Sequence, residues 1–187
     1  MKAYNIAVLV GSLRKESYNL KMAKALMHLA PDSLALQIVN IGDLPLYNED
    51  LEATVPAQWK AFREEVKTFE GLLFVTPEYN RSVPAPLKNA IDVGSRPYGK
   101  SVWNGKPGAV VSVSPGAMGA FGANHHLRQA LVFINVPAMP QPEAYIGGAA
   151  KLFDESGNLI NESTKQFMKA FMEAFAKWVD IHSGSNA

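Results

Sequence analysis

The sequence predicts a three-layer α/β fold in which helices cover both faces of a doubly wound, five-stranded parallel sheet. Three observations predict it. Strand-like and helix-like segments alternate along the chain, most of the strand-like segments are continuously apolar, and a glycine- and hydroxyl-rich turn follows the first of them. Continuous apolar runs are typical of strands buried on both faces. Such a turn after the first of five strands fits the strand order 2-1-3-4-5.

Five segments carry a strand pattern. The first, third and fourth are short apolar runs, and the second alternates between apolar and polar residues. The fifth contains Pro140 and Pro142, which suits an irregular edge strand. We expect the strands at residues 4–10, 34–41, 71–76, 108–113 and 138–146.

Helical periodicity separates and follows these strands. Apolar side chains recur three and four residues apart in the first helical segment, and Pro56 suits the first turn of the second. We expect helices at residues 20–29, 56–69, 87–95, 124–134 and 161–181, joined by loops. No repeat or linker divides the sequence, so residues 1–182 should form one domain, followed by a disordered tail at 183–187.

Composition excludes several classes of function. The chain has 187 residues, a net charge of +1 and no cysteine. Without cysteine there is no disulfide, thiolate catalysis, iron–sulfur cluster or cysteine zinc site. A charge so near neutral disfavours a nucleic-acid surface. No run approaches the roughly 20 apolar residues of a membrane span, and the first apolar run is too short for a secretory signal. We therefore expect a cytoplasmic protein.

The turn after the first strand carries a phosphate-binding pattern. Residues 11–19 read Gly-Ser-Leu-Arg-Lys-Glu-Ser-Tyr-Asn and lead into the first helix. The first helical turn has backbone N–H groups without internal partners, and the helix dipole adds positive charge there. Neutral and cationic side-chain donors surround the same point. A P-loop or a dinucleotide fingerprint needs more glycines, so a terminal phosphate is the expected ligand. The alternative is an ordinary turn in which Ser17 and Asn19 only cap the helix.

Two further loops should lie beside this turn, because strands 1, 3 and 4 end at one edge in the 2-1-3-4-5 order. Residues 77–86 combine stiffening prolines with Tyr79, whose planar ring could support a flat heterocycle. Residues 114–122 contain glycines that allow a backbone to approach a ligand closely. Taken singly, the loops could be a surface turn and a flexible connector. Taken together, they favour one ligand at this edge.

Three motifs resemble the NAD(P)H-dependent FMN reductase family, whose fold is flavodoxin-like. They are Gly-Ser-Leu-Arg-x-x-Ser-x-Asn at 11–19, Pro-Glu-Tyr-Asn-x-Ser-x-Pro at 77–84 and Leu-Lys-Asn-Ala-Ile-Asp at 87–92. Within that family, the chain resembles the bacterial quinone reductases that are also described as chromate reductases. The resemblance covers most of the chain.

The resemblance implies FMN as the cofactor and NADPH or NADH as the electron donor. The residues that it assigns to FMN are Ser12, Arg14, Ser17, Asn19 and Leu20 on the phosphate side, Pro77, Glu78, Tyr79, Asn80 and Ser82 along the isoalloxazine, and Ser114 and Gly116 at its pyrimidine edge. No catalytic side chain is expected, because FMN carries the chemistry. No metal site is expected either, because no second ligand pattern lies near the paired histidines. His125 and His126 are interpreted as packing, capping or interface groups.

The implied activity is a two-electron, ping-pong reduction of quinones, with chromate, azo or nitro compounds as further acceptors. Two alternatives come from other classes of function. One is a flavodoxin-type electron carrier, which the neutral charge disfavours because such carriers are strongly acidic. The other is a flavin reductase that releases reduced FMN. Arg81 could meet the 2′-phosphate of NADPH or an anionic acceptor, or could simply be a solvated loop residue.

The resemblance also implies a homodimer, and two dimers are expected to form a tetramer. The segment 124–134 is apolar at positions 127, 130, 131, 133 and 134, a stripe wide enough for both a core and a neighbour. The alternative is that one subunit buries the whole stripe. Arg128 and Glu143 are candidates for polar pairs between dimers.

Overall fold

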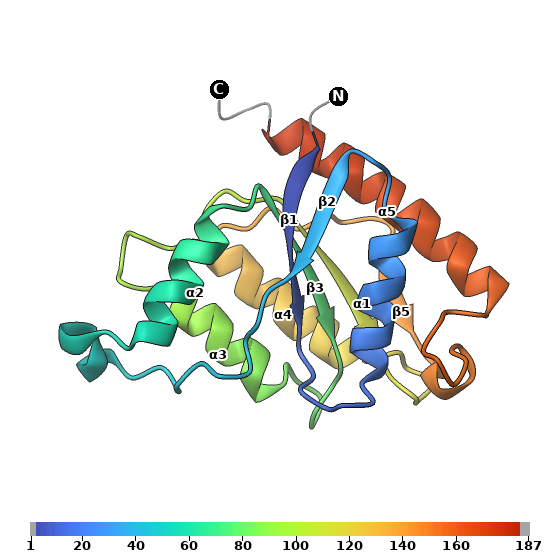
Figure 1. Cartoon of the computed structure of the whole chain (residues 1–187), viewed down its shortest axis with the longest axis horizontal. Helices are drawn as coiled ribbons and strands as arrows, with labels where there is room; N and C mark the ends of the chain where they lie inside the picture. The colour runs from blue at the N-terminus through green and yellow to red at the C-terminus, as the bar shows by residue number, and fades with distance from the viewer. Residues whose placement is uncertain (1–2, 184–187) are drawn as a thin grey trace.

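The protein is a five-stranded parallel sheet covered by helices on both faces (Figure 1). The structure is a computed structural model and describes residues 3–183. The strand order is β2-β1-β3-β4-β5, and all neighbouring strands pair in parallel. The predicted fold class and strand order are therefore confirmed.

The sheet is built from β1 (Tyr4–Val10), β2 (Leu34–Ile38), β3 (Gly71–Thr76), β4 (Gly108–Val113) and β5 (Ala144–Ile146). The first, third and fourth strands have the predicted bounds, since each is a run of mostly apolar residues. The expected strand 138–146 is wrong over its first half, where only an isolated bridge joins Ala138 to Gly108. Prolines in that stretch lack the N–H that a ladder needs, so β5 starts after them.

The helices are α1 (Tyr18–Leu29), α2 (Ala57–Lys67), α3 (Ala85–Gly94), α4 (Phe121–Phe133) and α5 (Glu162–Ser183), with short 3₁₀ turns η1 (Glu49–Thr54) and η2 (Ala149–Lys151). The predicted start of α4 at residue 124 is three residues late. Ala120 adopts a left-handed conformation with φ 60°, which ends the preceding loop and starts the helix at once. α5 includes Ser183, so the rest of the predicted tail, 184–187, lies outside the described residues.

Two apolar layers hold the helices on the sheet. α1 and α5 cover one face, and α2, α3 and α4 cover the other (Figure 1). Phe171 and Phe175 of α5 are fully buried on the first face, as are Trp59 and Trp103 on the second. Burying each such side chain contributes about 1.5–3 kcal/mol. No helix among the described residues is long and apolar enough to cross a membrane.

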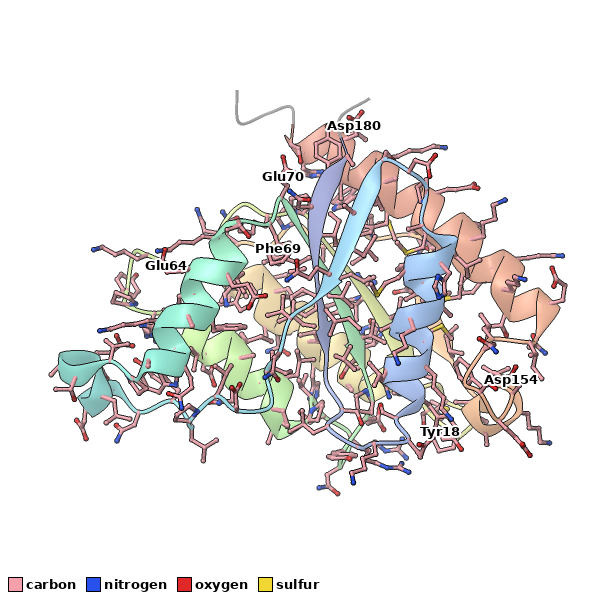
Figure 2. The ribbon with its side chains drawn as sticks, viewed as in Figure 1. Tyr18, Glu64, Phe69, Glu70, Asp154 and Asp180 are labelled. Carbon is pink, nitrogen blue, oxygen red and sulfur yellow. The ribbon has the colours of Figure 1, made fainter. Side chains whose placement is uncertain are left out.

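The first strand and the last helix meet at the end of the sheet where the parallel strands begin. The Tyr4 hydroxyl donates to Asp180 Oδ1 at 2.8 Å, and Asp180 lies at the upper edge in Figure 2. The opposite edge, where the strands end, is left to the connecting loops. Tyr18 marks it at the bottom of the same view.

Candidate functional site

Three loops meet at the carboxyl ends of β1, β3 and β4, as the topology predicts. They are residues 11–17, 77–84 and 114–120. The first two are packed tightly together. A Cβ added at Gly11 would lie 3.1 Å from both Pro77 and Pro84. A side chain at this position would push these loops apart by a few tenths of an ångström, so the glycine that opens the phosphate motif suits their close approach.

The first loop is an array of donors without protein partners. Among the described residues, the backbone N–H groups of residues 12–16 make no hydrogen bond. Ser17 caps α1, since its Oγ accepts from the Leu20 N–H at 3.2 Å, and its own hydroxyl proton remains available. The Arg14 side chain is exposed and has no partner in the part that the structure describes. Free N–H groups, hydroxyls and a guanidinium at a helix N-terminus suit a phosphate.

Asn19 has a different position from the one expected of a simple phosphate ligand. Its side chain is buried, and Nδ2 donates to the Val113 carbonyl at 3.3 Å, which ties α1 to the end of β4. Its buried Oδ1 has no hydrogen-bond partner among the described residues. That oxygen can only accept, so it suits a hydroxyl donor better than a phosphate oxygen.

The second loop is a tight turn that presents Tyr79. Backbone hydrogen bonds of 3.1 Å and 2.9 Å pair Tyr79 with Ser82 in both directions. Asn80 and Arg81 make the turn with left-handed φ values of 50° and 63°. The two backbone hydrogen bonds restrain the residues that flank the turn, Tyr79 and Ser82. The Tyr79 ring remains 53% exposed, which leaves a planar surface available to a ligand.

Glu78 points away from solvent and toward α4. Its side chain is only 13% exposed, Oε1 accepts from Arg81 Nη1 at 3.1 Å, and Oε2 accepts from the Ala123 N–H at 3.0 Å. Each oxygen of the Glu78 carboxylate therefore accepts a hydrogen bond from the protein. Arg81 is paired with it, yet the Arg81 side chain remains 78% exposed.

The third loop lies against the segment that follows β5. The Ser114 N–H donates to the Ile146 carbonyl at 2.9 Å, and the Ala149 N–H donates to the Ser114 carbonyl at 3.1 Å. The Ser114 hydroxyl accepts from the Gly116 N–H at 3.1 Å. Ser114 and Gly116, the two residues assigned to the pyrimidine edge of the isoalloxazine, both lie in the loop after β4, as expected, and Gly116 is exposed there.

A buried polar network beneath the third loop was not predicted. Ser112 Oγ donates to the Gly119 carbonyl at 2.7 Å, Asn124 Nδ2 reaches Ser112 Oγ at 3.2 Å, and Arg128 Nε donates to Asn124 Oδ1 at 2.9 Å. Arg128 also donates to the Met139 carbonyl within the same chain. The signal in the sequence was a serine inside an apolar strand and an asparagine inside an apolar helix face.

Both histidines of α4 make structural contacts. His125 forms a cluster of rings with Phe121 and Tyr145, and its Nε2 lies 3.0 Å from the Tyr145 hydroxyl. Partial burial raises the pKa of Tyr145 to about 12, and Glu143 adds to the shift. His126 Nδ1 lies 3.0 Å from Ser82 Oγ. In the described residues, no group of three or more candidate ligands could hold a metal ion.

Comparison with protein families identifies the family of the chain. The model of the family described as NADPH-dependent FMN reductase matches residues 4–151, which include all three loops. The chain belongs to the NADPH-dependent FMN reductase family. The family and cofactors predicted from the motifs are thereby confirmed, and this FMN reductase-family protein is an oxidoreductase that uses FMN and NAD(P)H.

Similar proteins extend over nearly the whole chain. A quinone reductase of Pseudomonas putida is 66% identical over 182 residues, 97% of either chain. A 2-hydroxy-1,4-benzoquinone reductase of a Burkholderia species is 46% identical over 177 residues, covering 95% of this chain and 97% of its own. The solved structure of FerB, a flavoenzyme NAD(P)H:(acceptor) oxidoreductase of Paracoccus denitrificans, has a TM-score of 0.91 at 42% identity, covering 96% of this chain and 99% of its own.

The donors of this FMN reductase-family site fit the cofactor. The first loop offers unpaired N–H groups, hydroxyls and Arg14 for a phosphate, and the buried Asn19 Oδ1 lacks a donor of the kind that a ribityl hydroxyl supplies. Tyr79 offers an exposed planar ring. The assignments of individual residues to parts of FMN remain predictions.

Proposed function

We propose that this protein is an FMN-dependent NAD(P)H:quinone oxidoreductase. The observation that carries the proposal is the donor array of residues 12–17 at the start of α1, beside the exposed ring of Tyr79. A relative of 66% identity is a quinone reductase, which supports quinones as acceptors. A cytoplasmic location is part of the proposal, because NAD(P)H is supplied there.

The first loop would hold the FMN phosphate. Arg14 supplies a charged fork, and the hydroxyls of Ser12 and Ser17 supply neutral donors beside the backbone N–H groups. Leu20 is held by the Ser17 cap and fixes the first turn of α1. Asn19 would accept from the ribityl chain. These contacts would place the phosphate at the positive end of the helix dipole.

The second and third loops would hold the ring. One wall would consist of Pro77, Glu78, Tyr79, Asn80 and Ser82, and the turn closed by the Tyr79–Ser82 bonds would limit the orientations that the ring can take. Ser114 and Gly116 would form the opposite wall, with their own N–H groups already bonded to the Ile146 carbonyl and to Ser114 Oγ. When bound, FMN supplies the redox chemistry by taking a hydride from the nicotinamide and passing two electrons to the acceptor. No side chain is needed as nucleophile or general base.

A single exposed face of the isoalloxazine ring would have to bind the nicotinamide and the quinone in turn. We therefore expect parallel lines in double-reciprocal plots of NAD(P)H oxidation against a benzoquinone, because the nicotinamide must leave before the quinone enters. The measurement is steady-state turnover with NADH and NADPH against quinone, free FMN, an azo dye and chromate. The yellow FMN complex should survive gel filtration.

Intersecting lines would contradict the shared face. Loss of FMN on gel filtration, with turnover only when free FMN is supplied, would favour the flavin reductase instead.

We also propose that the protein assembles as a homodimer, and as a tetramer of two dimers. Within the predicted apolar stripe of α4, Leu127 and Leu131 are buried in the subunit, but Phe133 is 82% exposed. Phe133 lines a groove of about 620 Å³ between α3 and α4. This supports a neighbour on that face. Arg128, whose Nε and Nη1 are engaged inside the subunit, is a poorer candidate for a pair between dimers.

Light scattering at micromolar concentration should give a multiple of the 20.4 kDa chain mass. Phe133→Glu should shift the mass toward that of one chain, because a charge would replace a large apolar contact. A wild-type mass of one chain would contradict the assembly.

A further inference from the structure

We infer that Glu78 is a positioning residue whose carboxylate fastens the ring-side loop to the first turn of α4, so that FMN affinity depends on this connection. The inference rests on the proposed function, because it concerns the loop that would flank the ring. It assigns to Glu78 a role through protein contacts, where the family resemblance implies only proximity to the isoalloxazine.

The start of α4 needs an acceptor from elsewhere. Its N-cap residue is Ala120, which has no side-chain acceptor, so no local side chain satisfies the N–H groups of the first turn. The Ala123 N–H instead donates to Glu78 Oε2 at 3.0 Å, across 45 residues of sequence. A carboxylate at this place also interacts favourably with the helix dipole. Glu78 thus caps a helix that begins where the third loop ends.

The surroundings of the carboxylate are shaped to receive it. A Cβ at Gly122 would lie 2.9 Å from Glu78 Oε2 and 3.0 Å from the Arg81 carbonyl oxygen. Glycine at this position is therefore what allows the carboxylate and the turn to approach α4. Arg81 Nη1 binds the other oxygen at 3.1 Å and balances the charge beside the ring site.

The turn at residues 78–82 contacts α4 at both of its ends. Glu78 reaches the Ala123 N–H, and Ser82 Oγ lies 3.0 Å from His126 Nδ1, three residues further along α4. Tyr79 and Asn80 lie between these two points. Because α4 also closes the third loop, the carboxylate joins the two walls of the proposed ring site, and its reach should set their separation.

The test compares variants that differ in reach and in charge. Glu78→Ala removes the acceptor, Glu78→Asp keeps the charge but withdraws it by about 1.5 Å, and Glu78→Gln keeps the reach without the charge. FMN dissociation constants are measured by quenching of flavin fluorescence on apoprotein, and hydrogen exchange is followed at the Ala123 amide. Glu64→Ala is the matched control, since Glu64 pairs with Lys67 at the same i,i+3 spacing on α2, away from the loop edge (Figure 2).

We expect Glu78→Ala and Glu78→Asp to weaken FMN binding about tenfold and to speed exchange at Ala123, as loss of a charge-assisted hydrogen bond should. Glu78→Gln should weaken binding by about threefold or less, because its amide oxygen still reaches the helix. The Glu64→Ala control should change neither readout.

Wild-type FMN affinity in Glu78→Asp would overturn the inference, whatever the exchange rate. If Glu78→Ala does not fold, the contrast between Glu78→Asp and Glu78→Gln still decides. Failure of wild-type apoprotein to bind FMN would instead contradict the proposed function.

Discussion

Arg14→Ala is expected to weaken FMN binding by about 1.5–3 kcal/mol, the range for a hydrogen bond to a charged group. This corresponds to an increase of about ten- to a hundredfold in the dissociation constant. Arg14 lies in the loop whose N–H groups have no partner in the described part of the chain, so its guanidinium would add a charged fork to a phosphate bound at the start of α1. The constant is measured by fluorescence quenching on apoprotein.

Lys15→Ala is the control for this change. Lys15 is the next residue, carries the same charge and is exposed, but it is not part of the phosphate motif. Its loss should change FMN affinity far less than the loss of Arg14. Equal effects would mean that the loop acts only through its net charge, and an unchanged affinity in Arg14→Ala would refute the phosphate assignment.

Gly119→Ala is expected to lower the free energy of unfolding by about 2–5 kcal/mol, from left-handed strain together with overpacking. Gly119 has φ +58°, and a Cβ there would lie 2.5 Å from the Tyr145 carbonyl carbon and 2.8 Å from the Ile146 nitrogen. Backbone atoms of β5 cannot move aside as a flexible side chain can. The third loop would have to lift from β5, so FMN affinity should fall as well. Urea denaturation of apoprotein measures the effect on stability.

Gly116→Ala in the same loop is the matched control for stability. A Cβ at Gly116 would meet only Ser114 Oγ, at an ordinary 3.5 Å. Its free energy of unfolding should stay close to that of the wild type. Equal destabilisation by both changes would show that the loop tolerates no added volume anywhere, and no destabilisation by Gly119→Ala would show that β5 does not hold the loop as described.

Local sequence signals were sufficient where one pattern decides the structure. β1, β3 and β4 have the predicted bounds because buried parallel strands are continuous apolar runs. The meeting of three loops at the carboxyl ends of β1, β3 and β4 could be predicted from the strand order alone. The start of α4 could not be predicted, because it depends on Ala120 in a left-handed conformation that alanine seldom adopts.

The contacts within the site depended on tertiary structure. The motif that contains Glu78 could be recognised, but its bond to Ala123 joins two loops through a helix end that no local pattern marks. Ser112 and Asn124 were visible as polar residues within apolar segments, yet their pairing became evident only once β4 and α4 were packed together.

The bond between Tyr4 and Asp180 has a topological consequence. It brings the beginning of β1 and the last turns of α5 together at the end of the sheet farthest from the three loops. A short peptide linker could therefore connect the start of β1 to the end of α5, and a new pair of termini could be opened in the exposed turn at residues 97–100 without altering which strands are neighbours in the sheet. Such a circular permutant would show whether the same sheet forms when its strands are synthesised in a different order.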